Sequence, residues 1–311
     1  MGQPTHEGLS YDKRDEKGKM QKELVPQTPF QEFRHSFGLN KGAVIGLVVL
    51  LFFLCIGISS PLLAPYNPTQ LFDGAYRLPP AFASGGSSKF LLGTDDVGRD
   101  ILSRLIYGTA LSLAVGIMVV VVSLVTGTIF GLLAGYFEKS IDRTIMRFTD
   151  IIMALPSTLL AIVVAAILGP GLVNAVWAVS IVAIPNYIRL VRALVMAEKK
   201  RAYVMAAQSY GTGHIRIMVS EILPNCMAPI IVQATLGLSE GILNAAALGF
   251  LGLGAQPPTP EWGTMLADAR PFLESSPWMV TFPGLCILLV VLALNLVGDG
   301  LRDALDPRLK K

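Results

Sequence analysis

Long apolar runs separated by short polar segments dominate the chain. Six of these runs are close to the roughly 20 residues that a helix needs to span a bilayer. They cover residues 42–64, 109–136, 150–168, 172–191, 227–254 and 279–297. The pattern therefore predicts an all-α polytopic membrane protein with six transmembrane helices.

Lysine and arginine residues assign a membrane side to each polar segment, because cytoplasmic segments are enriched in them. With both termini inside, the inner segments are residues 1–41, 137–149, 192–226 with the adjacent Arg189, and 300–311. They hold seven, three, six and four of the 25 basic residues, whereas the outer loops at 65–108 and 255–278 hold four and one. This asymmetry predicts an N-in/C-in topology around a transmembrane core at 109–299.

Composition agrees with a membrane protein and narrows the chemistry. Of 311 residues, 52% are hydrophobic and 15% are charged, with a mean hydropathy of +0.57. The net charge of +3 reflects topology, and no basic stripe interleaved with aromatic residues suggests nucleic-acid binding. The three cysteines lie in or beside apolar runs and the three histidines are scattered, so we predict neither disulfides nor a metal site.

The segment before the first span predicts a tail and a short helix. Residues 1–25 are polar and predict a mobile cytoplasmic tail without a signal peptide. Phe30, Phe33 and Phe37 then recur at helical spacing. This spacing favours an amphipathic helix on the inner membrane face over a disordered linker.

The outer loop predicts a second surface helix. Thr94 is a suitable cap for a helix that ends near residue 108, after an irregular stretch at 65–92. Two i,i+4 pairs, Asp95–Arg99 and Asp100–Arg104, would stabilise it. This helix is either a plain interfacial element or part of an outer vestibule.

Small residues and prolines inside the spans indicate how the helices meet. Gly127, Gly131 and Gly135 lie four apart in the second span, and such a stripe lets another helix approach closely. Pro156 and Pro185 each remove a backbone hydrogen bond, which predicts kinks in the third and fourth spans.

The fifth span carries the most polar face. Gln233, Gly237, Glu240 and Asn244 fall within about 60° of one another at 100° per residue. A carboxylate inside a span is costly and indicates function by default. Two interpretations stay open. In the first, the stripe faces a hydrated path or a partner subunit. In the second, its polar side chains bond neighbouring helices together, and Glu240 is paired with a neighbour.

The polar segment at 203–225 is longer than a turn between two spans requires. Residues 203–210 suit one or two helical turns, and Gly211 can redirect the chain. A second helix from His214 has an apolar face, made by Ile215, Met218, Val219 and Ile222. We expect Pro224 to end this second helix. A helix–Gly–helix unit with one apolar side is typical of a docking element, and the alternative is an interfacial packing loop.

Signatures of catalysis and of nucleotide binding do not occur. The motifs GxxxxGK[ST] and HExxH are missing from the sequence. The string GxSxG occurs once, at 237–241, but it lies inside an apolar run, and no histidine is placed to serve its serine. We therefore predict that the chain has no ATP-binding P-loop and is neither a metalloprotease nor a serine hydrolase. It has no visible energy source of its own.

The segment at 203–225 resembles the cytoplasmic EAA loop of ABC importer permeases. Ala206, Ala207, Gly211 and Pro224 match the pattern of that loop, whereas Met205 stands where the family usually has Glu. Residues 92–108, 146–157, 246–266 and 282–311 resemble the C-type permease of bacterial dipeptide and oligopeptide importers. The similarity covers nearly everything from residue 28 on, and the dipeptide branch is the most similar one.

The resemblance implies a type I ABC importer permease fold in a bacterial inner membrane. The loop would form coupling helices that bind the ATPases, through Ala206, Ala207, Gly211, His214, Ile215, Met218 and Pro224. The implied partners are a second related permease, two cytoplasmic subunits that bind ATP and Mg, and a periplasmic or lipid-anchored peptide-binding protein. Membrane lipid would surround the spans, and this chain would hold no cofactor and catalyse no reaction.

Several functions remain as alternatives to dipeptide uptake. Importers of oligopeptides, glutathione or nickel share much of the same pattern. A secondary transporter would need its own coupling-ion site, for which Glu240 is the obvious carboxylate. A membrane enzyme would need a paired acid, nucleophile or metal set in the spans, and a membrane scaffold would transport nothing.

Overall fold

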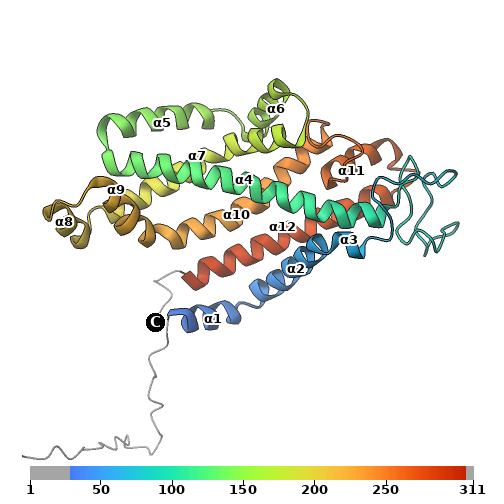
Figure 1. Ribbon diagram of the computed structural model, residues 1–311, viewed down its shortest axis with the longest axis horizontal. Helices are drawn as coiled ribbons and strands as arrows, with labels where there is room; N and C mark the ends of the chain where they lie inside the picture. The colour runs from blue at the N-terminus through green and yellow to red at the C-terminus, as the bar shows by residue number, and fades with distance from the viewer. Residues whose placement is uncertain (1–28, 306–311) are drawn as a thin grey trace, which may run out of the picture.

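The computed structural model describes residues 29–305, and this part of the chain is built from helices without a β-strand (Figure 1). The predicted all-α class is confirmed. The helices are α1 Pro29–Leu39, α2 Lys41–Ile58, α3 Ser60–Leu63, α4 Ile101–Phe137, α5 Lys139–Met153, α6 Ser157–Leu168, α7 Leu172–Glu198, α8 Ala202–Ser209, α9 His214–Arg216, the π-helical η1 Ile217–Ile222, α10 Leu223–Phe250, α11 Trp262–Ala269, the 3-10 turn η2 Arg270–Phe272 and α12 Trp278–Leu305. The predicted tail at 1–25 lies outside the described residues.

Five helices of the described part are long and apolar enough to cross a membrane. They are α2, α4, α7, the continuous run from α9 to α10, and α12. The remaining predicted span, residues 150–168, is wrong as a single helix, because α5 and α6 meet at a bend of 92°. Together they form a broken sixth span or a re-entrant pair.

The two prolines in the spans behave differently. Pro156 has no N–H group and disfavours helical backbone at the residue before it. It therefore ends one helix and leads into the next, rather than kinking a single helix as predicted. Pro185 lies inside α7, which continues without a break from Leu172 to Glu198.

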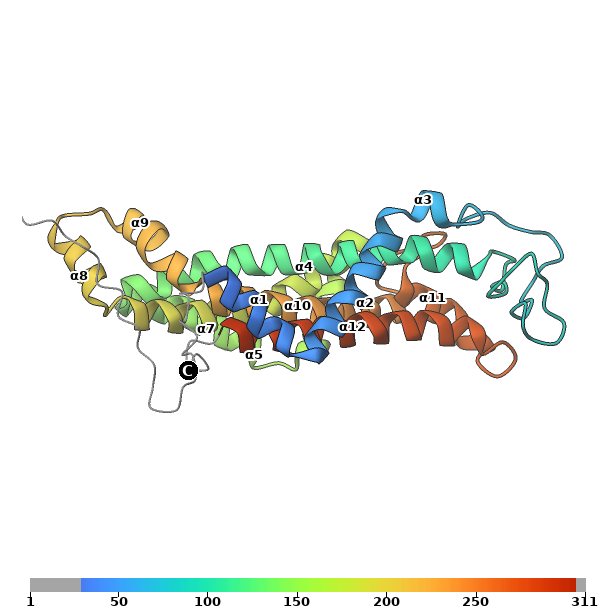
Figure 2. The same ribbon diagram turned by 90° about the horizontal axis from the view of Figure 1, so that it is seen from below.

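The short elements gather at the two ends of the bundle of long helices (Figures 1 and 2). α1, α8 and α9 lie at one end, where α12 also finishes, whereas α11 and the loop between α3 and α4 lie at the other. At the first end Asn40 donates a hydrogen bond from Nδ2 to Oδ2 of Asp303 over 3.2 Å, which ties the start of α2 to the end of α12. The predicted inner segments therefore share one end, and their orientation in the membrane remains a prediction.

The predicted surface helix that starts at Thr94 is wrong. α4 begins at Ile101, and Asp100 caps it by accepting a hydrogen bond from the backbone N–H of Ser103 over 2.8 Å. Residues 94–100 form a turn instead, with Gly98 in left-handed backbone at φ 87°. The 37-residue α4 thus joins the predicted helix and the second span into one element.

Buried charges fix this outer end. Arg99 pairs with Asp95 at 2.5 Å, as predicted, but across the turn rather than along a helix. Arg104 lies 3.5 Å from Asp95 and 4.0 Å from Asp268 of α11, so the predicted pair with Asp100 is wrong. Burial raises the pKa of Asp268, and the two guanidinium groups oppose this shift. Because an unpaired buried charge is strongly destabilising, this network holds α11 against α4.

α4 and α7 pack closely along the glycine stripe. A Cβ atom added at Gly131 would lie 2.7 Å from Cβ of Val191, and one at Gly135 would lie 2.7 Å from Cβ of Val195. At Gly127 it would collide with Cβ of Tyr187. The stripe therefore lets the two backbones approach along about two turns.

Replacing Gly131 with alanine should destabilise the protein. The added methyl group meets Val191 and the carbonyl oxygen of Ile188, and we expect a loss of about 1–3 kcal/mol in the free energy of unfolding. The measurement is thermal unfolding of the purified protein in detergent. Gly284→Ala in α12 is the matched control, because open space surrounds Gly284. Equal melting temperatures for both variants would contradict close packing of α4 on α7.

Candidate functional site

The polar face of α10 lines a pocket against α7. Gln233, Gly237, Glu240 and Asn244, which the sequence predicts as one stripe, all contribute to its wall. The pocket has a volume of about 80 Å³ and is closed from the α7 side by Asn186 and Tyr187. Ser157, the first residue of α6, also lines it, so the broken span brings a hydroxyl to the same place.

Glu240 is the one charged side chain in the lining of this pocket. It is exposed, and within residues 29–305 it has no hydrogen bond or ion pair. Within the described residues, therefore, no neighbour in the same chain neutralises Glu240, as one of the two interpretations required. A carboxylate in a spanning helix that keeps its charge needs water or a partner from outside the chain.

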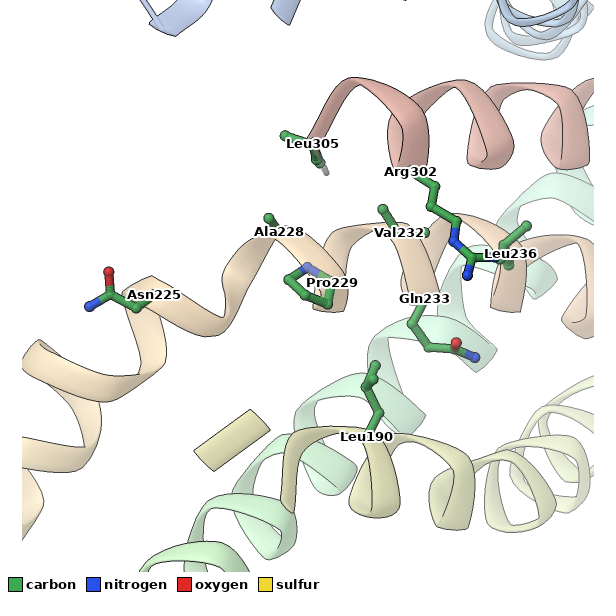
Figure 3. Close-up of a pocket in the computed structure, with 9 residues that line it drawn as sticks. All are labelled: Leu190, Asn225, Ala228, Pro229, Val232, Gln233, Leu236, Arg302 and Leu305. Atoms are coloured by element: carbon green, nitrogen blue, oxygen red, sulfur yellow. The ribbon is translucent and has the colours of Figure 1, made fainter. Parts of the chain in front are cut away.

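A second, larger pocket continues the groove toward the end that holds α8 and α9 (Figure 3). Its volume is about 550 Å³, and Gln233 belongs to its wall as well. The walls are mainly apolar, with Leu190 of α7 on one side and Pro229 and Leu236 of α10 on another. Arg302 of α12 extends its guanidinium group over this space.

The two pockets share Gln233 and together form one groove on the α7–α10 face, polar in the smaller pocket and mainly apolar in the larger one. Asn225 lines the end of the groove nearest α9, and Asn244 lines the opposite end. The two residues are 19 positions apart, and at about 1.5 Å per residue the groove extends over about 28 Å. This length is close to the roughly 30 Å hydrocarbon thickness of a bilayer. The groove is therefore about as long as the hydrocarbon core of a bilayer is thick.

The segment predicted as a docking element forms two short helices around a turn. α8 carries Ala206, which is exposed, and Ala207, which is half-buried. Gly211 follows with φ 75° and open space around it, so the left-handed backbone explains why a glycine occurs there. Met205, also on α8, is exposed on the surface of the protein.

His214 anchors the second helix to the end of α4. The hydroxyl group of Tyr136 lies 2.9 Å from Nδ1 of His214. The imidazole ring also makes edge contacts with Tyr136 and Phe137. In α8, the hydroxyl of Tyr203 donates a hydrogen bond to Oε1 of Glu198 at the end of α7 over 2.7 Å, and partial burial together with this bond raises the pKa of Tyr203 to about 12. The two helices are thus held to the bundle at both ends.

The predicted apolar docking face is wrong as a continuous surface. Met218 and Ile222 are buried in the protein's own core, together with Ile217, Val191 and Val195. Ile215 is 75% exposed, and Val219 is also exposed. A helical period alone does not distinguish a face that packs inward from a face that binds a partner, and here the same helix does both.

Pro224 does not end the second helix as predicted. α9, η1 and α10 form one helical run from His214 to Phe250. In the π-helical part the N–H of Leu223 donates to the carbonyl oxygen of Met218, five residues earlier. This wider turn accommodates the proline that follows, whose missing N–H would otherwise break a regular ladder.

The sequence prediction missed Asn186, Tyr187, Ser157 and Arg302 as lining residues. Asn186 is a polar residue inside an apolar span, which is a signal that could have been used. Arg302 was only counted as a basic residue of the tail, and Tyr187 carries no signal in its sequence context. Their position depends on how α6, α7 and α12 meet α10.

The sequence of this chain is similar to those of known proteins. The family described as "Binding-protein-dependent transport system inner membrane component" matches residues 127–311, and "N-terminal TM domain of oligopeptide transport permease C" matches residues 28–80. The dipeptide transport system permease protein DppC of Escherichia coli strain K12 is 60% identical over 287 residues, which cover 92% of this chain and 96% of that protein. The di/tripeptide transport system permease protein DppC of Pseudomonas aeruginosa strain UCBPP-PA14 is 56% identical over 287 residues, with 92% and 95% covered.

One solved structure has a related fold. A chain of the MetNI methionine ABC transporter in an inward-facing conformation is 19% identical, with a TM-score of 0.53. The match covers 65% of this chain and 96% of that chain. At this identity the similarity concerns the fold alone.

Truncating the two isoleucines of the docking segment should separate its buried side from its exposed side. Ile217→Ala should lower the free energy of unfolding by about 2–5 kcal/mol, because the side chain is fully buried. Ile215→Ala should change it by less than about 0.5 kcal/mol. Thermal unfolding of the purified protein measures both. A larger effect at Ile215 would contradict the packing of this segment.

Proposed function

The chain belongs to the family of binding-protein-dependent transport system inner membrane components and has the fold of a type I ABC importer permease, and we propose that it takes up dipeptides across the bacterial inner membrane. The observation that carries the proposal is the identity of 60% over 92% of the chain with a dipeptide transport system permease protein. The groove on the α7–α10 face supplies a physical route.

The chain acts as one subunit of an assembly. A second related permease completes the path, and the exposed carboxylate of Glu240, which lines the groove, supports this because it has no partner within residues 29–305. Two cytoplasmic subunits bind ATP and Mg and hydrolyse the nucleotide, and a periplasmic or lipid-anchored protein delivers the peptide. The family membership supports these partners, as does the absence of a P-loop motif in the sequence.

The α8–α9 end is the cytoplasmic side in this proposal. The bias of Lys and Arg toward the predicted inner segments supports an N-in/C-in orientation. Ile215 and Val219 then face the cytoplasm, where the ATP-binding subunits lie. Closure of those subunits would move α8 and α9, and the buried side of the same helix would transmit the motion to the spans.

The gating of the path follows from this arrangement. Alternating access requires the groove to open toward one side of the membrane at a time. The charged network around Arg104 keeps the outer end rigid, whereas the continuous helix from α9 to α10 joins the docking segment directly to the polar stripe. A shift of α9 therefore changes the position of Gln233 and Glu240.

Uptake in vesicles tests the proposed function. The assembled transporter, reconstituted with its ATPases and binding protein, should import labelled Ala-Ala only with ATP. Import should continue with an uncoupler and stop when the ATPases are left out. Uptake that survives loss of the ATPases and collapses with the uncoupler would support a secondary transporter instead. Competition by excess oligopeptide, glutathione or nickel, but not by dipeptides, would assign the chain to another substrate branch.

An aspartate at Ile215 should uncouple the transporter. The charge replaces an exposed apolar contact, so the fold should persist while binding of the ATPases weakens, by about 2 kcal/mol or more if Ile215 is a central contact. Co-purification of the ATPases and peptide-stimulated ATP hydrolysis are the readouts. Leu71→Asp is the control, because Leu71 is exposed in the loop at the opposite end. Normal retention and normal transport with Ile215→Asp would exclude this segment as the coupling element.

A further inference from the structure

A buried hydroxyl group without a partner borders the small polar pocket. Tyr187 is 2% exposed, and its Oη makes no hydrogen bond within residues 29–305. A Cβ atom added at Gly237 would collide with this oxygen. The hydroxyl therefore points across the pocket wall to α10, on the side where Glu240 lies.

No hydrogen bond within the described residues explains why position 187 has the hydroxyl of a tyrosine. A buried polar group that lacks a hydrogen bond destabilises the fold, and phenylalanine would fill the same space without this cost. The packing against Gly127 uses Cβ of Tyr187, which phenylalanine also has. The hydroxyl is thus available for something that enters the pocket.

The chemistry of the pocket selects the kind of group that can enter. Its polar lining consists of neutral amides and hydroxyls from Ser157, Asn186, Gln233 and Asn244, with Tyr187, and its one formal charge is the carboxylate of Glu240. An anion would be repelled, whereas a cation with several N–H donors could bond the carboxylate and the tyrosine oxygen together. Such charge-assisted hydrogen bonds are the strong ones.

The volume limits how much of a solute can enter. A volume of about 80 Å³ has room for a few water molecules. An ammonium group and the carbon that bears it fit this space, and a whole dipeptide does not. The rest of the solute would lie on the open side of the groove.

We infer that this pocket is a transient subsite for the α-ammonium group of a peptide in transit, with Glu240 as its counter-charge and the Tyr187 hydroxyl as a second acceptor. The inference rests on the proposed function and adds the part of the cargo that the chain itself recognises. The hydroxyl of Tyr187 accepts a hydrogen bond from the ammonium group and orients it. The carboxylate of Glu240 supplies the opposite charge. Gly237 leaves room for the Tyr187 hydroxyl, because a side chain there would collide with it.

The test combines a change in the protein with a change in the cargo. The assembled transporter in vesicles, with its binding protein saturated, imports either Ala-Ala or lactyl-alanine, in which a hydroxyl replaces the α-ammonium group. We expect the wild type to import Ala-Ala faster, and Glu240→Gln to reduce the ratio of the two rates about tenfold. Tyr187→Phe should reduce it several-fold. The preference of the binding protein cancels, because it is the same for all variants.

A merely structural role would lower both rates equally and leave the ratio unchanged. Tyr107→Phe in α4 and Asp299→Asn in α12 are matched controls outside the pocket, and both should keep the wild-type ratio. If lactyl-alanine is not imported at all, the rate with Ala-Ala decides, and it should fall with both pocket variants while the assembled complex keeps its melting temperature.

The outcomes separate this inference from the proposed function. If the wild type imports neither cargo, the proposed function itself fails. If it imports Ala-Ala and both pocket variants keep the wild-type ratio and rate, the pocket holds only water and the inference is wrong. A ratio that changes with Glu240→Gln but not with Tyr187→Phe would overturn the role of the tyrosine.

Discussion

The close contact of α7 with two neighbouring helices is the constraint on which the rest of this structure depends. Tyr187 lies between them, with its Cβ against Gly127 of α4 and its hydroxyl against Gly237 of α10. Side chains at either glycine would separate the helices, and the groove between α7 and α10 would lose its depth. Because little hydrophobic driving force acts between helices in lipid, such close packing is what fixes their spacing.

The same stripe of α7 connects the site to the docking segment. Val191 and Val195, which fill the space beside the next two glycines, also belong to the core that holds Ile217 and Ile222. The segment that faces the ATPases in our proposal is therefore not a loose loop. Its inner side is part of the protein interior, and a displacement of α9 has to move either α7 or the start of α10.

Much of the fold follows from the sequence because it depends on local pattern. Apolar length, the glycine spacing and the turn at Gly211 each predict a feature that one stretch of chain determines. The polar stripe of α10 was also predicted, because a helical period places four residues on one face. Such a period indicates which residues share a face, and this information sufficed for the part of the site that lies on one helix.

The failures have a common cause. Thr94 and Asp100 are both good caps, and only the fold of the outer loop, with Gly98 in left-handed backbone, decides for Asp100. Met218 and Ile215 lie on one predicted face, and the position of the core buries the first and exposes the second. By itself, the sequence determined the class, the positions of most spanning helices and one polar face. The tertiary structure decided the opposite wall of the pocket, the free hydroxyl of Tyr187 and the break at Pro156, because these depend on which helices come into contact.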